Sequence, residues 1–237
     1  MMGADRHKLH EYADREALAE ALAAGVGAVL AGGLATRGSA ILAVSGGSTP
    51  RLFFETLARA EIDWQAVTVL LVDERWVPAG HERANATLVH RHLLQGPAAA
   101  ARFEPYYTEG LGAPEGAARL SQLFGHLARP IDALVLGMGA DGHTASFFPG
   151  ADRLAEALDP ATPRLFEAVE APGAGEPRVT LTLPPIVEAR FLALHIEGEE
   201  KRRVLAQAQA PGPWEALPVR AVLRSPRAHP IEIFWAP

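Results

Sequence analysis

Three short apolar runs, almost uninterrupted by polar residues, constrain the fold of this chain more than any other feature. They are SAILAVS (39–45), VTVLLVDE (67–74) and IDALVLGMG (131–139), and polar or glycine-rich residues follow each run. Continuous apolar runs of this length are typical of strands that are buried on both faces, as in parallel sheets. Helical periodicity separates the runs, so we expect an α/β fold with a mostly parallel sheet and helices on both faces.

The rest of the chain continues this alternation. Helices are predicted over 15–30, 49–60, 84–94, 114–128 and 198–210, and further strands over 164–172, 178–183, 191–198, 221–225 and 231–236. No repeat or low-complexity linker divides the chain. We therefore expect a single domain over residues 1–237.

Charge and cysteine content exclude several classes of function. The net charge is -6 and the pI is about 5.8, so no global positive field attracts nucleic acid or an anionic membrane. Without cysteines, disulfides, thiolate catalysis and cysteine-ligated zinc are absent. The N-terminus lacks the apolar core of a secretory signal, and no stretch is expected to reach the ~18 apolar residues of a membrane span. A cytoplasmic location is expected.

The loops that follow the three apolar runs are the candidates for a ligand site, because open α/β sheets bind ligands beyond the carboxyl ends of their strands. The first loop is SGGSTP (45–50). Its two glycines allow the backbone to approach a ligand closely, and the start of the next helix offers free N–H groups to an anion. A phosphate cradle and an ordinary strand-to-helix turn both fit this loop.

The second loop is DERWVP (73–78), which places Asp73, Glu74 and Arg75 at the end of an apolar run. Asp73 is suited to accept hydrogen bonds from hydroxyl groups, and Arg75 is suited to stabilise an oxygen that gains negative charge. An internal ion pair explains the same residues equally well.

The third loop is GMGADGHTASFFPG (137–150), which begins with the G-x-G-x-x-G pattern of dinucleotide-binding proteins. That pattern requires an apolar helix to follow and an acidic residue about 20 positions further on. Here a proline and a glycine follow instead, so we reject the dinucleotide hypothesis. A histidine held by glycines at a strand end remains, and His143 is suited to proton transfer near neutral pH.

Five motifs in order, from about Ile41 to about Lys201, carry a resemblance to a known family. SGGSTP, DERWVP with Asn85 soon after, GMGADGHTASFFPG, PRVTLT and GEEK are similar to the motifs of 6-phosphogluconolactonases, a branch of the group that includes glucosamine-6-phosphate deaminase. The resemblance implies a Rossmann-like fold of the NagB/RpiA type. It also implies hydrolysis of 6-phospho-D-glucono-1,5-lactone in the oxidative pentose phosphate pathway.

The resemblance also implies a role for individual residues. His143 corresponds to the general base, and Asp73 and Arg75 to the wall that faces the sugar. The implied phosphate ligands are Gly46, Gly47, Ser48, Thr49, Arg178 and Lys201, and the implied pocket residues are Ser45, Asn85, Gly139, Asp141 and Gly142. Lys201 is independently unusual, because only it and Lys8 are lysines among the 22 basic residues.

Two alternative functions fit the sequence less well. A sugar-phosphate deaminase of the same fold carries a glutamate shortly after the histidine, whereas this chain has SFFPG (146–150) there. A non-catalytic sugar-phosphate sensor would lack the base, and His143 is present. We expect a monomeric enzyme without a metal or other cofactor, whose partner is a small sugar-phosphate lactone and which binds neither nucleic acid nor membrane.

Overall fold

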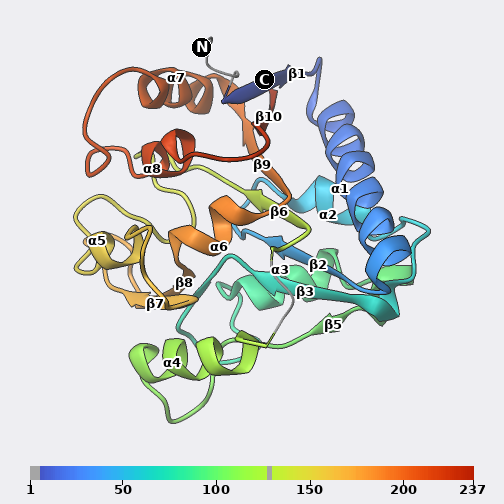
Figure 1. Ribbon diagram of the computed structural model, residues 1–237, viewed down its shortest axis with the longest axis horizontal. Helices are drawn as coiled ribbons and strands as arrows, with labels where there is room; N and C mark the ends of the chain where they lie inside the picture. Colours follow the sequence, from blue (N-terminus) through green and yellow to red (C-terminus); the bar gives the residue numbers. More distant parts are fainter. Residues whose placement is uncertain (1–5, 127–129) are drawn as a thin grey trace.

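A seven-stranded parallel sheet forms the centre of the computed structural model, which describes residues 6–126 and 130–237 (Figure 1). Its strands, in spatial order, are β1 (His7–Glu11), β10 (Ile231–Ala236), β9 (Phe191–Glu197), β6 (Ala133–Leu136), β2 (Ala40–Val44), β3 (Val67–Leu71) and β5 (Arg102–Phe103). Every neighbouring pair runs parallel. The predicted α/β class is therefore confirmed.

The three apolar runs form adjacent strands in the middle of this sheet. All residues of β2 and β6 are buried, because helices cover both faces and leave no solvated side for polar residues. The helices are α1 (Arg15–Arg37), α2 (Arg51–Leu57), α3 (Asn85–His92), α4 (Ala113–Phe124), α5 (Leu154–Ala157), α6 (Leu183–Glu188), α7 (Gly198–Gln209) and α8 (Val219–Arg224). In Figure 1, α1 runs along one side of the sheet, and α6, α7 and α8 lie on the other.

Helix α1 covers much of one face of the sheet. The carboxylate of Asp14 accepts a hydrogen bond from the backbone N–H of Ala17 at its start, and Gly38 ends it with a left-handed φ of 72°. By length and composition this 23-residue helix is sufficient to cross a membrane, so the expectation that no stretch is long enough was wrong. Its residues Leu18, Leu22, Val26 and Leu30 are buried in the hydrophobic core.

A second, three-stranded antiparallel sheet was not predicted. It has the order β4 (Asp73–Arg75), β8 (Arg178–Leu181) and β7 (Phe166–Val169). The predicted strand 67–74 is in fact two strands, because the chain leaves the parallel sheet after Leu71 and pairs with β8 instead. The charged residues of DERWVP thus stand on a separate small sheet beside the large one.

Further differences include a helix and a strand near the ends of the chain. The predicted strand 221–225 is wrong: these residues form most of α8, whose Val219, Val222 and Leu223 are buried at helical spacing. The edge strand β1 was not predicted, because its sequence HKLHE is largely polar. Residues 127 and 128 of the predicted helix 114–128 lie outside the described residues.

Candidate active site

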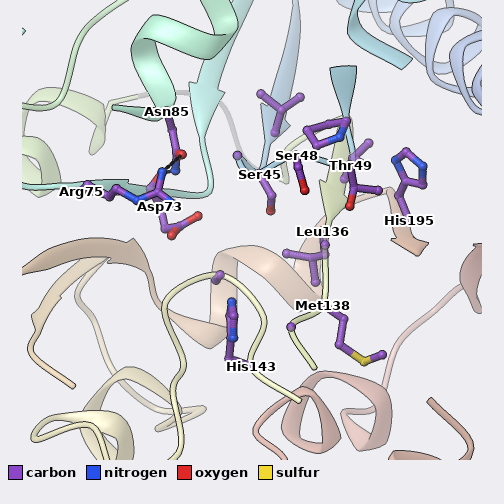
Figure 2. Close-up of a pocket in the computed structure, with 18 of the residues that line it drawn as sticks. Ser45, Ser48, Thr49, Asp73, Arg75, Asn85, Leu136, Met138, His143 and His195 are labelled. Carbon is purple, nitrogen blue, oxygen red and sulfur yellow. Dashed lines mark hydrogen bonds between the residues drawn. The ribbon is translucent and has the colours of Figure 1, made fainter. Parts of the chain in front are cut away.

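A cavity of about 400 Å³ opens at the carboxyl ends of β2 and β6. The chain passes from β2 to β3 on one side and returns in β6 on the other, so this is the point where the strand order reverses. The loops that follow β2 and β6 line the cavity, together with residues of β4, β8, β9 and the starts of α3 and α7 (Figure 2).

The loop after β2 lies close to the start of α3. A Cβ atom added to Gly46 would lie 1.9 Å from the side-chain oxygen of Asn85, so no larger residue fits without moving Asn85. Gly47 has a φ of 96°, which favours glycine. The hydroxyl of Ser45 is buried and has no hydrogen-bond partner among the described residues, so it is available to a ligand.

Asp73 and Asn85 form a polar wall of the cavity. The hydroxyl of Ser146 donates a hydrogen bond of 2.6 Å to the Asp73 carboxylate, and both side chains are buried. Asn85 donates from its side-chain nitrogen to the backbone carbonyl of Asp73 at 2.8 Å. Its side-chain oxygen accepts a hydrogen bond of 3.0 Å from Arg75 (Figure 2). The Arg75 guanidinium also donates to the carbonyl of Arg83.

Glu74 connects the backbone of the two elements that carry Asp73 and Asn85, a role that the sequence did not indicate. Its carboxylate accepts hydrogen bonds from the backbone N–H groups of Arg75, Asn85 and Ala86 at 2.7, 2.7 and 2.8 Å. The carboxylate therefore caps α3 and ties it to β4. Burial outweighs these hydrogen bonds and raises the pKa of Glu74 from 4.5 to about 7.

His143 is held by a carboxylate in the loop after β6. Asp141 accepts hydrogen bonds from the Nδ1 of His143 at 2.5 Å and from its backbone N–H at 3.1 Å. A carboxylate only accepts hydrogen bonds, so Nδ1 carries the proton and Nε2 has the lone pair. Partial burial alone would raise the pKa of Asp141, but the hydrogen bond and charge of His143 lower it overall.

Arg178 contributes a buried cation next to this histidine. Its guanidinium lies 5.4 Å from the centre of the Phe148 ring, and that ring lies 4.3 Å from the imidazole of His143. It donates one hydrogen bond of 3.0 Å, to the carbonyl of Ala174, while its Nε has no partner among the described residues. Burial lowers the pKa of Arg178.

The cavity brings together most of the residues that the sequence predicted. All the predicted catalytic and phosphate-binding residues line it, as do Ser45, Asn85 and Gly139. Asp141 and Gly142 are not among its lining residues: Asp141 orients His143, and the carbonyl of Gly142 accepts a hydrogen bond of 3.0 Å from Val219, which fixes the loop against α8.

Several lining residues were missed, among them Met138, Phe148 and His195. The first two lie within the glycine-rich motif, five residues before and five residues after His143, and this place in the motif was the available signal. His195 is isolated in the sequence and gives no signal there for a place in the site. Within residues 6–126 and 130–237, no cluster of three or more histidine, cysteine, aspartate or glutamate side chains is arranged to hold a metal ion.

Comparison with known proteins identifies the family. Residues 13–235 match the family model for glucosamine-6-phosphate isomerases/6-phosphogluconolactonase. A 6-phosphogluconolactonase of Rhizobium meliloti is 54% identical, over 97% of this chain and 98% of its own length. One from Pseudomonas putida is 41% identical, over 97% of this chain and 93% of its own.

Solved structures agree with these relatives. The crystal structure of a 6-phosphogluconolactonase from Shewanella baltica has a TM-score of 0.93 and 38% identity, with all of both chains covered. This chain therefore belongs to the glucosamine-6-phosphate isomerase/6-phosphogluconolactonase family.

Proposed function

We propose that the protein hydrolyses 6-phospho-D-glucono-1,5-lactone to 6-phospho-D-gluconate, with His143 as the general base, in the oxidative pentose phosphate pathway. The observation that carries this proposal is the pairing of His143 with Asp141 at a cavity that also holds three cationic side chains. These cations are Arg75, Arg178 and Lys201. The 54% identity to a protein named 6-phosphogluconolactonase supports the choice of substrate.

In the proposed first step, Nε2 of His143 accepts a proton from water while the water oxygen bonds to the lactone carbonyl carbon. The carbonyl π electrons move to its oxygen, which becomes an oxyanion. Asp141 stabilises the imidazolium that forms, because its carboxylate holds the Nδ1 proton. Arg75 and the unpartnered hydroxyl of Ser45 both line the cavity, and we propose them as hydrogen-bond donors to this oxyanion.

In the second step the tetrahedral intermediate collapses and the bond between the carbonyl carbon and the ring oxygen breaks. The imidazolium returns its proton to the leaving ring oxygen, which becomes the hydroxyl of the open-chain product. The new carboxylic acid then loses a proton to solvent. One histidine thus serves both steps, and no covalent intermediate on the protein is needed.

The substrate's phosphate does not react, and the cavity offers cations to hold it. We assign this role to the loop from Gly46 to Thr49 with Arg178 and Lys201, as the family resemblance implies. Binding energy from such a group lowers KM and helps to position the lactone against His143.

Deamination of an amino-sugar phosphate is the alternative reaction on this fold. The segment after the histidine favours hydrolysis, because SFFPG (146–150) contains no acidic residue, whereas the deaminases carry a glutamate shortly after the histidine. Phe148 packs on the imidazole of His143 and supplies no carboxylate to open a sugar ring.

The deciding experiment is an assay on freshly generated 6-phosphogluconolactone, corrected for its spontaneous opening, with glucosamine 6-phosphate as the competing substrate. We expect hydrolysis of the lactone and no release of ammonia. His143→Gln should lower kcat by about 10²- to 10⁴-fold while substrate binding and melting temperature stay close to those of the wild type. A folded His143→Gln protein with near-normal turnover would refute the general-base assignment.

A further inference from the structure

His195 lies at the cavity between the starts of two helices. It belongs to β9, and its imidazole contacts the ring of Phe53 in the first turn of α2 at a centroid distance of 6.3 Å. Lys201 follows in the first turn of α7, directly after β9. In Figure 2, His195 and Thr49 stand on the same side of the cavity, away from Asp73 and Arg75. His195 therefore borders the region assigned to the phosphate.

The two ring nitrogens of His195 have different surroundings. Nε2 lies 3.2 Å from a carboxylate oxygen of Glu197, which fixes a proton on Nε2 because a carboxylate only accepts. Nδ1 is buried and has no hydrogen-bond partner among residues 6–126 and 130–237. The side chain of His195 is only 3% exposed, so bulk water does not supply the missing partner of Nδ1. An unsatisfied buried polar atom is costly, and because the residue that carries it lines the cavity, a ligand there is the available partner.

We propose that His195 is a further substrate-binding residue, which donates a hydrogen bond from protonated Nδ1 to the phosphate of the substrate. This inference rests on the proposed function, because it assumes that a phosphate occupies this side of the cavity. Glu197 stabilises the imidazolium by holding the Nε2 proton, and the bound phosphate adds a second negative charge beside the ring.

The charged groups around the ring are few. Glu197 shares its carboxylate with Arg15 of α1, at 3.3 Å, so its negative charge is already partly balanced. Lys201 lines the same cavity and opposes protonation of His195 while no anion is bound. On the neighbouring strand, Phe234 lies opposite His195 and separates it from the titratable His10 of β1. Binding of an anion is therefore expected to be coupled to protonation of His195.

Calorimetric titration with inorganic sulfate tests this coupling, because sulfate stays a dianion at every pH used and is not hydrolysed. Wild type and His195→Phe are compared at about pH 5.5 and about pH 8, on either side of the range in which imidazoles titrate. Phenylalanine keeps the ring but has no donor. We expect His195→Phe to weaken sulfate binding by about 10- to 100-fold at the lower pH and far less at the higher pH.

Two further variants make the result specific. In His195→Asn the amide nitrogen is as many bonds from Cα as Nδ1 and does not titrate, so we expect it to keep part of the affinity without the contribution of His195 to the pH dependence. His10→Asn, on the far side of Phe234, should bind sulfate like the wild type. Because all these proteins share their other ionisable groups, only the difference between variant and wild type reports on His195.

Equal sulfate affinity of wild type and His195→Phe at both values of pH would overturn the proposal, as would an absence of sulfate binding to the wild type. If His195→Phe has a lowered melting temperature, the folded His195→Asn variant decides by its pH dependence. Turnover of the lactone is measured separately on the wild type. A wild type that binds sulfate through His195 but leaves the lactone intact would refute the proposed function and keep the anion site.

Discussion

Arg75 and Arg178 lie directly opposite each other in the register of β4 and β8, so two guanidinium groups share one face of the small sheet. Like charges in this position destabilise a sheet. The Nε atoms of both side chains are buried and have no hydrogen-bond partner among the described residues. Asp73, two residues from Arg75, and Glu176, which is already paired with Arg83, are acidic residues whose charges act on Arg178. The pair is thus incompletely neutralised by the protein and is suited to an anionic ligand.

The first prediction is that Arg178→Met weakens ligand binding without lowering the stability of the fold. Arg178 is a buried cation with one hydrogen bond. Its removal should therefore leave the unfolding free energy unchanged or raise it by about 1 kcal/mol, and the melting temperature should not fall. KM should rise by about 10- to 100-fold. Steady-state kinetics and thermal melts on the same preparation test this, with the exposed Arg203→Met as control. A lower melting temperature with an unchanged KM would make Arg178 a purely structural residue.

The second prediction concerns the carboxylate that orients the base. Asp141→Asn keeps the size of the side chain but loses the charge that stabilises the imidazolium and the group that fixes its tautomer. We expect kcat to fall by about 10²- to 10⁴-fold with little change in melting temperature. The exposed Asp63→Asn serves as the matched control. Wild-type turnover in Asp141→Asn would mean that the contact with His143 has no part in catalysis.

The third prediction concerns Gly139, which lies against the side chains of His143 and Asp141. A Cβ atom at residue 139 would lie 2.1 Å from Nδ1 of His143 and 2.4 Å from the carboxylate of Asp141. Gly139→Ala should therefore separate the two side chains and lower kcat more than it raises KM. Gly32→Ala, whose new methyl group would meet no heavy atom within 4 Å, should leave turnover unchanged. Equal kinetics in both variants would contradict this geometry.

The fourth prediction is a pH dependence of stability that originates from Glu74. Its pKa is raised from 4.5 to about 7, so between these values the folded state binds the proton more tightly than the unfolded chain does. Its stabilising contribution is then present below about pH 4.5 and is lost as the pH rises towards 7, by at most on the order of 3 kcal/mol.

Chemical denaturation at several pH values measures this contribution. We expect the unfolding free energy of Glu74→Gln to decline less between about pH 4.5 and 7 than that of the wild type, whereas Glu82→Gln, an exposed control, should follow the wild type. Parallel curves for wild type and Glu74→Gln would show that this carboxyl group does not titrate in the window.

The sequence predicted the elements whose signals are local. Strands β2, β3 and β6 were predictable because strands covered on both faces need continuous apolar runs. Helices α1 and α7 were predictable because their apolar residues recur at helical spacing. The small sheet was missed because β4 continues the same apolar run as β3, and only tertiary pairing with β8 separates the two. Helix α8 was misread because Val222 and Leu223 also suit a strand.

The candidate site was predictable to the extent that its residues sit in loops at strand ends. His143 and the loop from Gly46 to Thr49 follow central strands of the parallel sheet, so their meeting at one edge follows from the fold class. His195 and Glu74 carry no such signal. Their roles depend on contacts between distant parts of the chain, such as the approach of β9 to α2 and of β4 to α3.

The parallel alignment of β1 and β10 has a practical consequence for handling the protein. His7 and Ile231 are register partners at the amino edge of the sheet, whereas Pro237 follows β10 at the carboxyl edge, where the cavity opens. A purification tag or surface linker attached after Pro237 would therefore emerge on the edge through which substrate enters. The surface around His7 and Ile231 lies at the opposite edge of the sheet, so immobilisation there leaves the cavity accessible.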